Sequence, residues 1–389
     1  MMRILLIHNY YKQAGGEDTV FHQEAQLLQE HGHTVEKLTF SNNDVTSTKA
    51  KLQAALGVVY NNQSASVIRR KLLEFKPDVV HVHNFFPLVS PAVFDVCHKY
   101  KVPVVMTLHN YRLICPSALL HYNGKVQLEN VQKVFPIKPI LQGVYRGSKV
   151  ETASVVLTTG LHKLLGTWRY KVSKFIALTP GAAELFLNSS LKPKPEQVVV
   201  KPNFTDDVGI GAPQRQGYVL YIGRLTEEKG IYTLLKAHEQ QPFPLKIVGT
   251  GPLQQDVEAY AAKHANVEYL GFRKREEAME LLKNATALVF PSEWMETFGM
   301  TVVEAFATGT PVIAAKIGGA EYLVKHKHNG LHFAPGNAQE LREQVAVLLQ
   351  NPPLAMALGR HARQDYQDNY TAAINYGLLL QIYQQTIGK

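Results

Sequence analysis

The stretch ETFGMTVVEAFATGTPV, residues 296–312, lies between two apolar runs that read as strands. One run ends at Phe290, and the other begins at Val312. Between them, a loop carries Glu296 and a helix is expected to begin near residues 298–300. A strand, a helix and a second strand in close succession are typical of a parallel sheet covered by helices.

The same alternation continues in both directions from this stretch. In the second half, strands are expected at 218–222, 245–248, 267–270, 287–290 and 312–315. In the first half, strands are expected at 3–8, 34–40, 78–83, 102–108 and 175–178, with helices such as 17–31 and 91–100 between them. The sequence therefore predicts an α/β protein with two Rossmann-like domains in tandem.

The alternation breaks near residues 192–207, where prolines at positions 193, 195 and 202 interrupt a helix-poor segment. We place the domain boundary there, with a first domain at 1–204 and a second domain at 205–364. The charge balance changes at the same point. Of the formal net charge of +9, residues 1–205 carry +11 and the remainder −2. The excess positive charge therefore belongs to the first domain.

Two cysteines are too few for a disulfide framework, and the longest apolar runs fall far short of the roughly 20 residues of a membrane span. The start of the chain shows no signal-peptide core. We expect a protein of the reducing cytoplasm. The stretches 67–76 and 161–174 mix apolar, aromatic and basic residues, which fits either a helix on an anionic membrane surface or an amphipathic helix packed on its own sheet.

A candidate anion site lies at the start of the helix expected near Phe298, Gly299 and Met300. The first backbone N–H groups of a helix have no partner within it, and they attract anions. Glu296 precedes this point and Glu304 follows it by about one turn. Because carboxylates repel phosphates, they are better suited to accept hydrogen bonds from sugar and ribose hydroxyls. The alternative is that Glu296 and Glu304 bind no ligand and only stabilise the start of the helix through its dipole.

The run GRLTEEKG, residues 223–230, follows another expected strand. Thr226 is placed to cap a helix that begins there. Lys229 then lies at the N-terminal end of that helix, where the helix dipole is unfavourable for a cation. An anionic ligand bound there would offset this repulsion. Arg224 offers forked donors that suit a diphosphate. Alternatively, the two cations simply pair with Glu227 and Glu228.

Two glycine loops follow expected strands. Gly15 and Gly16 open a helix and allow the backbone to approach a ligand closely. The pair lacks the third glycine of a dinucleotide fingerprint, and Gly249-Thr-Gly251 is also incomplete, so NAD is only weakly indicated.

Histidines gather at expected strand ends, at His81, His83 and His109. Such a group could hold zinc, but no fourth ligand is evident, and hydrogen bonding to substrate is the better interpretation. No Asp-x-Asp pair is present to hold a metal on a diphosphate.

Taken together, Glu296-x7-Glu304, the 223–230 run, the Gly15-Gly16 loop, Pro291-Ser292 and Gly309-x-Pro-Val resemble the retaining GT-B glycosyltransferases of family 4, the group 1 transferases. This resemblance implies two Rossmann-like domains facing across an interdomain cleft, with a last helix, residues 365–389, that packs back on the first domain. Relatives with a run similar to YRLICP, residues 111–116, often carry further cysteines downstream. This chain has none, so no metal-clipped loop is expected.

The resemblance also implies roles for particular residues. Those expected in catalysis are Arg224 and Lys229 on the diphosphate, Glu296 on the transferred sugar and His109 facing that sugar. Those expected to bind the donor are Gly15, Gly16, Gly271, Phe272, Phe298, Gly299, Met300 and Glu304. Those expected on the acceptor side are Glu17, Asn84 and Asn110. No metal site and no cofactor are expected.

The implied reaction is the transfer of a hexosyl unit from a nucleotide-diphosphate sugar (UDP, GDP or ADP) with retention at the anomeric carbon. The expected acceptor is a saccharide or a lipid-linked molecule of cell-surface polysaccharide or glycolipid synthesis. The basic first domain suggests contact with the inner face of the plasma membrane. The alternatives are a non-hydrolysing nucleotide-sugar epimerase of the same fold and a nucleotide-binding protein without enzyme activity. Nucleic acid is not expected as a partner, since no reading motif accompanies the positive charge.

Overall fold

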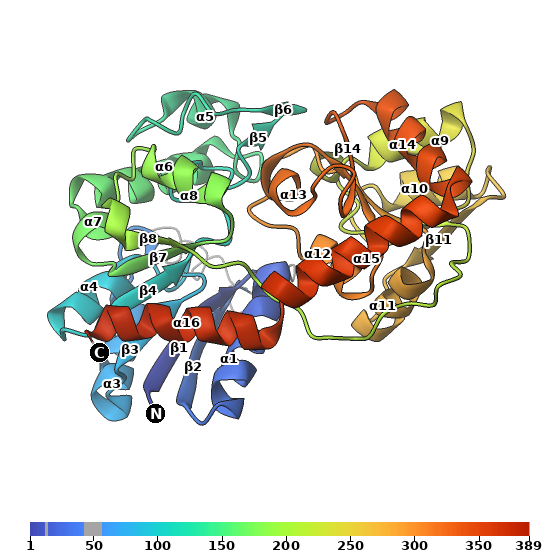
Figure 1. Ribbon diagram of the computed structural model, residues 1–389. Coiled ribbons are helices and arrows are strands. Elements are labelled where there is room, and N and C mark those ends of the chain that lie inside the picture. The colour runs from blue at the N-terminus through green and yellow to red at the C-terminus, as the bar shows by residue number, and fades with distance from the viewer. Residues whose placement is uncertain (12–14, 43–56, 389) are drawn as a thin grey trace. The chain divides into compact units, whose positions relative to one another are not determined.

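The computed structural model describes residues 1–11, 15–42 and 57–388, which fall into two compact units (Figure 1). Unit 1 comprises Met1–Tyr122, Gln127–Lys201 and Tyr376–Lys389, and unit 2 comprises Asn123–Val126 and Pro202–Asn375. The boundaries expected after residues 204 and 364 both lie inside unit 2. Helix α15 (Pro352–Asn369) packs on α12 (Met300–Ala307) of unit 2. The chain therefore returns to unit 1 only within the last helix, at Tyr376.

Unit 1 is built on a six-stranded parallel sheet of order β2-β1-β3-β4-β7-β8. Its strands are β1 (Arg3–Tyr10), β2 (Thr34–Ser41), β3 (Val79–Val82), β4 (Val104–Thr107), β7 (Lys174–Ala177) and β8 (Val198–Val200). The five strands predicted for this half are confirmed. β8 was not predicted, because its three residues border the proline-rich segment.

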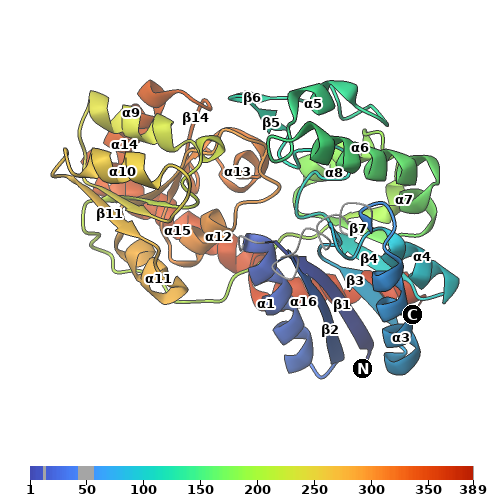
Figure 2. The same ribbon diagram turned by 180° about the vertical axis from the view of Figure 1, so that it is seen from behind.

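Helices cover both faces of this sheet. On one face, Phe21 of α1 (Gly16–Glu30) and Leu379 and Tyr383 of α16 (Ala372–Ile387) share a buried cluster with Ile4 and Leu6 of β1. Figure 1 shows α16 lying across the strands. α3 (Asn62–Phe75) and α4 (Ala92–Lys99) pack together on the opposite face, toward the viewer in Figure 2.

The remaining elements of unit 1 follow β4. They are helices α5 (Ile137–Gln142), α6 (Lys149–Leu164), α7 (Thr167–Tyr170) and α8 (Pro180–Leu187), and the 3₁₀ turn η2 (Pro195–Gln197). The short strands β5 (His121–Tyr122) and β6 (Lys125–Val126) pair with each other. In the part of the chain that the structure describes, no helix is both long and apolar enough to cross a membrane.

Unit 2 contains a second six-stranded parallel sheet, of order β11-β10-β9-β12-β13-β14. Its strands are β9 (Val219–Ile222), β10 (Leu245–Val248), β11 (Val267–Gly271), β12 (Ala287–Phe290), β13 (Val312–Ala315) and β14 (Gly330–Phe333). The five strands predicted here are confirmed. β14 was missed because it is short and contains no β-branched residue.

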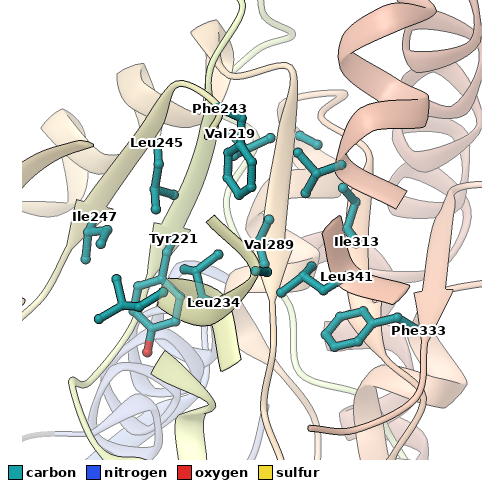
Figure 3. Packing of buried hydrophobic residues seen from close by; sticks show 14 of the residues in the cluster. Val219, Tyr221, Leu234, Phe243, Leu245, Ile247, Val289, Ile313, Phe333 and Leu341 are labelled. Atoms are coloured by element: carbon teal, nitrogen blue, oxygen red, sulfur yellow. The ribbon is translucent and has the colours of Figure 1, made fainter. Parts of the chain in front are cut away.

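The helices of unit 2 bury their apolar faces on this sheet. They are α9 (Ile231–Gln240), α10 (Gln254–Ala261), α11 (Arg275–Asn284), α12, α13 (Gly318–Leu323), α14 (Ala338–Gln350) and α15, with the 3₁₀ turn η3 (Glu227–Lys229). Figure 3 shows Tyr221, Val289 and Ile313 of the strands meeting Leu234 of α9 and Leu341 of α14. The predicted fold class, an α/β protein with two Rossmann-like sheets, is confirmed.

Strand order reverses beside the first strand of each sheet. In unit 1 the reversal lies between β1 and β3, and in unit 2 between β9 and β12. At such a point, loops that leave the carboxyl ends of adjacent strands diverge and open a crevice, which is where ligands bind in parallel α/β sheets. The loops after β1, β3, β9 and β12 are therefore the places to look for function.

Candidate functional site

In unit 2, the loops after β9 and β12 bring two predicted catalytic residues into contact. Lys229 Nζ lies 2.5 Å from Glu296 Oε1. The same carboxylate oxygen accepts hydrogen bonds from Ser292 Oγ at 2.8 Å and Trp294 Nε1 at 3.1 Å, and the ammonium group lies 5.3 Å from the Trp294 ring. Three donors on one oxygen hold the Glu296 carboxylate in a fixed orientation.

The predicted helix starting at Thr226 is wrong. Residues 227–229 form one 3₁₀ turn, and Thr226 makes no side-chain cap. The chain then turns at Gly230, with φ of +71°, and α9 begins only at Ile231. A Cβ on Gly230 would lie 1.9 Å from the carbonyl oxygen of Pro291. The glycine therefore lets the β9 loop touch the β12 loop, which is how Lys229 reaches Glu296.

Arg224 leaves the same β9 loop. Its carbonyl accepts a hydrogen bond from the Tyr221 hydroxyl at 2.8 Å, which fixes the backbone, while its side chain is exposed. Among the residues that the structure describes, no ion pair joins Arg224 or Lys229 to Glu227 or Glu228, the alternative that the sequence had left open.

Helix α12 begins at Met300, within the predicted range. The loop before it is held by α13, where Gly319 N–H donates to the Glu296 carbonyl at 2.7 Å. A Cβ on Gly319 would lie 2.1 Å from the Phe298 carbonyl oxygen, so only glycine allows this approach. Gly299, with φ of +125°, turns the chain into the helix. The Ile317-Gly-Gly319 signal was not recognised in the sequence.

Glu304 lies further along α12, beside a cation that the sequence analysis missed. Arg275 Nε is 3.8 Å from Glu304 Oε1, and Arg275 NH1 is 3.2 Å from Asp206 Oδ2. Burial raises the pKa of Glu304 to about 7, although the Arg275 charge acts in the opposite direction. The only hint in the sequence was the basic run 273–275 after β11.

Gly271 and Phe272 stand at the end of β11. Gly271 has φ of +66°, and the Phe272 side chain is 70% exposed. A large aromatic ring left in solvent at a strand end is suited to stack on a planar ligand. No hydrogen bond or ion pair links these two residues to Glu304 or Glu296 in the described ranges.

In unit 1, the three residues expected on the acceptor side lie together. Asn84 Nδ2 donates to Glu17 Oε1 at 3.1 Å and to the Asn9 carbonyl at 2.7 Å, and Asn110 Nδ2 donates to Glu17 Oε2 at 3.5 Å. Burial, and secondarily the charge of Asp18, raises the pKa of Glu17 to about 8, against the effect of Arg112. Near neutral pH this carboxyl can hold or release a proton.

Gly15 and Gly16 form the start of α1. Gly15 N–H donates to Asp18 Oδ2 at 3.0 Å, and Asp18 Oδ1 lies 2.7 Å from His8 Nε2. Among the described residues, no atom lies within 4 Å of a Cβ built on Gly15. Positions 13 and 14 of the predicted glycine loop lie outside the described residues.

His109 lies in a small pocket at the ends of β3 and β4. His83 Nδ1 is 3.1 Å from His109 Nε2, and burial lowers the pKa of both rings well below the usual value, so both are neutral. The polar side chains that line the pocket are Tyr11, His83, Asn84, Thr107, His109, Asn110 and Arg112.

Two groups of described side chains come close enough together to approach a cation. They are Glu24 with His81 and His83, and His8 with Glu17 and Asp18. In the first, both nitrogens of His81 are engaged, by the Tyr383 and Thr107 hydroxyls at 2.7 and 2.8 Å, and Lys201 Nζ lies 2.7 Å from Glu24. The ammonium group already neutralises the carboxylate, so this group does not fit a cation site.

Chemically, unit 2 presents Arg224, Lys229 and the amides of α12 to an anion, and Glu296 and Glu304 to hydroxyl groups. Unit 1 presents a buried carboxyl, amides and a neutral histidine. Neither unit shows a serine or cysteine nucleophile activated by a base among these residues. The arrangement suits the binding of phosphate and sugar groups.

Comparisons with known proteins agree. The model of the glycosyl transferases group 1 family matches residues 204–365, and that of glycosyltransferase family 4 matches residues 14–137. The D-rhamnosyltransferase WbpZ of Pseudomonas aeruginosa is 35% identical over 40% of this chain and 42% of that enzyme, less than half of either. The O-antigen chain mannosyltransferase C of Escherichia coli is 24% identical over 95% of both chains.

Solved structures show the same fold over the whole chain. Sucrose-phosphate synthase from Thermosynechococcus elongatus superimposes with a TM-score of 0.72 at 19% identity and covers 99% of both chains. Anabaena HepE in complex with UDP and glucose superimposes with a TM-score of 0.67 at 19% identity, covering 98% of this chain and 99% of that one. The GT-B architecture expected from the sequence is confirmed.

The raised pKa of Glu304 predicts a pH-dependent stability. A carboxyl whose pKa is about 7 in the folded protein and about 4.3 when unfolded binds its proton more tightly in the folded state, so its contribution to the free energy of unfolding falls as pH rises through this window. Glu304→Gln removes the ionisation. Its stability relative to the unaltered protein should rise between pH 5 and pH 8, by up to about 3 kcal/mol.

Denaturant unfolding at several pH values measures this difference in the free energy of unfolding. The contribution of Glu17, whose pKa is also raised, cancels because both proteins contain it. The exposed Glu276→Gln is the matched control and should show no such trend. A pH-independent difference for Glu304→Gln would contradict the assignment.

Proposed function

We propose that this chain, which belongs to the GT-B glycosyltransferases, transfers a hexosyl unit from a nucleotide-diphosphate sugar with retention at the anomeric carbon. The acceptor is a saccharide or a lipid-linked molecule in the synthesis of cell-surface polysaccharide or glycolipid. The observation that carries the proposal is the contact of Lys229 with Glu296 at the strand reversal of unit 2, beside the start of α12.

Unit 2 holds the donor in this proposal. Arg224 and Lys229 bind the diphosphate together with the amides at Gly299 and Met300, and Glu304 accepts from the ribose. Gly271 and Phe272 lie near the base, and Glu296 accepts from a hydroxyl of the transferred sugar. The related fold of HepE is known in complex with UDP and with UDP-glucose, which supports a nucleotide sugar, and UDP as its nucleotide, for the donor of this chain.

The reaction needs no covalent enzyme nucleophile in this proposal. As the glycosidic bond to phosphate breaks, negative charge grows on the leaving diphosphate. A preorganised donor aimed at that charge contributes roughly 3 kcal/mol to the transition state. The departing phosphate takes the proton of the acceptor hydroxyl, and His109 contacts the transferred sugar. Because Arg224, Lys229 and helix amides supply the positive charge, we propose that the reaction is independent of metal ions.

The acceptor meets unit 1, where Glu17, Asn84 and Asn110 present hydrogen-bonding groups. Glu17 is a secondary candidate for moving the acceptor's proton, because its raised pKa of about 8 lets it exchange a proton near neutral pH.

Product analysis tests this function. The purified protein, supplied with UDP-glucose or another nucleotide sugar and a saccharide acceptor, should form an α-linked product from an α-linked donor, seen by NMR of the anomeric proton, and at the same rate in EDTA. An inverted product contradicts the retaining mechanism, and inhibition by EDTA contradicts metal independence. Conversion of the donor sugar without any acceptor would instead identify an epimerase.

We also propose that unit 1 docks on an anionic membrane surface. α5 and α6, which pack together, expose large apolar side chains: Ile137, Leu141, Val150, Leu157 and Leu164, each at least 53% exposed. Exposed cations lie among them, at Lys133, Lys138, Arg146, Lys149 and Arg169, against two acidic residues, Glu129 and Glu151. Apolar residues bordered by positive charge fit the headgroup region of an anionic bilayer.

The sequence had left two interpretations for residues 67–76, a helix on a membrane surface or an amphipathic helix packed within the domain, and the second fits the structure. It forms most of α3, whose Ile68, Leu72 and Phe75 are buried in unit 1.

Vesicle flotation tests the membrane proposal. The protein should float with phosphatidylglycerol-containing vesicles and much less with phosphatidylcholine alone. The double variant Leu157→Ser, Leu164→Ser should reduce flotation severalfold, because both side chains are exposed and their loss leaves the core intact. Val347→Ser, at a 42% exposed apolar position in unit 2, is the matched control. Equal flotation of all three proteins, or none with anionic vesicles, would refute this docking surface.

A further inference from the structure

A fully buried ion pair lies beneath the pocket of unit 1. Lys201 Nζ, at the end of β8, is 2.7 Å from Glu24 Oε1 of α1, and both side chains are 0% exposed. A buried charge pair costs desolvation energy that a pair of apolar residues would not, so it adds little to stability by itself. The pair lies beside residues at the strand ends, which points to a role in the site.

The other oxygen of Glu24 faces the histidines. Glu24 Oε2 is 3.4 Å from His83 Nε2 and 3.8 Å from His81 Nδ1. The contact with His83 is electrostatic, since neither Glu24 Oε2 nor His83 Nε2 has a hydrogen-bond partner among the residues that the structure describes. On its other side, His83 Nδ1 is 3.1 Å from His109 Nε2, and the two rings stack at 5.2 Å. A continuous chain of polar groups thus runs from Lys201 through Glu24 and His83 to His109 in the pocket.

This chain fixes which ring nitrogen carries each proton. Glu24 is paired with Lys201, and its second oxygen is the polar atom that faces His83 Nε2 at 3.4 Å. A carboxylate oxygen attracts an N–H and repels a lone pair, so we assign the proton of the His83 ring to Nε2. His83 Nδ1 then accepts a hydrogen bond from the N–H at His109 Nε2. His109 is left with its proton on Nε2 and its lone pair on Nδ1.

We propose that Glu24 is a positioning residue for His109, acting through His83, and that it sets both the tautomer and the orientation of the His109 ring. The inference rests on the proposed function, in which His109 contacts the transferred sugar. Glu24 itself touches neither donor nor acceptor.

The surroundings of His83 support a neutral ring. The titratable groups that face the two histidines are His8 of β1, Glu24 of α1, His81 of β3 and Lys201, which follows β8. His81 Nδ1 lies 3.8 Å from the same Glu24 oxygen, but its hydrogen bonds go to the hydroxyls of Tyr383 at 2.7 Å and Thr107 at 2.8 Å. The tautomer of His83 therefore depends on Glu24.

The direct test reads the His109 ring by ¹⁵N NMR in the full-length protein without substrate. The unaltered protein should show a protonated Nε2 and an unprotonated Nδ1. In Glu24→Gln, whose amide can donate as well as accept, His109 should shift to the other tautomer or to a mixture. Tyr383→Phe, which removes a buried hydroxyl from His81 alone, is the matched control and should leave His109 unchanged. An unchanged His109 in Glu24→Gln would overturn the proposal.

Kinetics with the nucleotide sugar provide the second test. Glu24→Gln should lower kcat about tenfold or more, since a displaced contact at the reacting sugar is costly, while the KM for donor changes little. Because Lys201 loses its partner in that variant, Glu24→Gln combined with Lys201→Met removes both charges and preserves folding. The double variant should remain as slow as the single one.

Recovery of full activity in the double variant would show that the pair is only structural, and would overturn the inference. Should the unaltered protein transfer no sugar at all, the proposed function fails, and the NMR measurement still decides the tautomer.

Discussion

The reversal of strand order beside the first strand of each sheet is the constraint on which the rest of this structure depends. It sends the chain toward opposite edges of the sheet after β1 and β3 in unit 1, and after β9 and β12 in unit 2. The main polar contact of each proposed binding region sits at one of these two points. Lys229 meets Glu296 at one, and Glu17 meets Asn84 at the other.

Buried charge is handled differently in the two units. In unit 2, the Lys229 and Glu296 side chains remain partly accessible, at 24% and 10%, so a ligand can share their charges. In unit 1, Glu24 and Lys201 are sealed from solvent and can act only on their neighbours. The first pair is suited to bind and the second to orient. Both follow from the high cost of an unpaired charge in a protein interior.

Much of the fold could be predicted from the sequence, because β-branched and apolar runs repeat at regular intervals. Glu17, Asn84 and Asn110 were expected on the acceptor side from the family resemblance. They lie together because each follows the carboxyl end of a parallel strand, and these ends meet at one edge of the sheet. The prediction of a helix beginning at Thr226 was wrong because it rested on local signals, a capping residue followed by two acidic residues. These signals carry no information about Gly230, whose close approach to Pro291 is a tertiary contact. Arg275, Glu24 and Lys201 were missed for a similar reason, since their partners lie far away in sequence and no spacing marks them.

The central claim is that unit 2 holds a nucleoside diphosphate through Arg224 and Lys229, and calorimetric titration tests it most directly. UDP, GDP and ADP are titrated in EDTA into the unaltered protein, Arg224→Ala and Lys229→Ala, with Lys263→Ala as an exposed cation elsewhere in unit 2. The account predicts saturable binding of at least one nucleotide, weakened about tenfold or more by each of the first two substitutions and unchanged by the third. Equal affinity in all four proteins, or no binding of any of the three nucleotides, would contradict it.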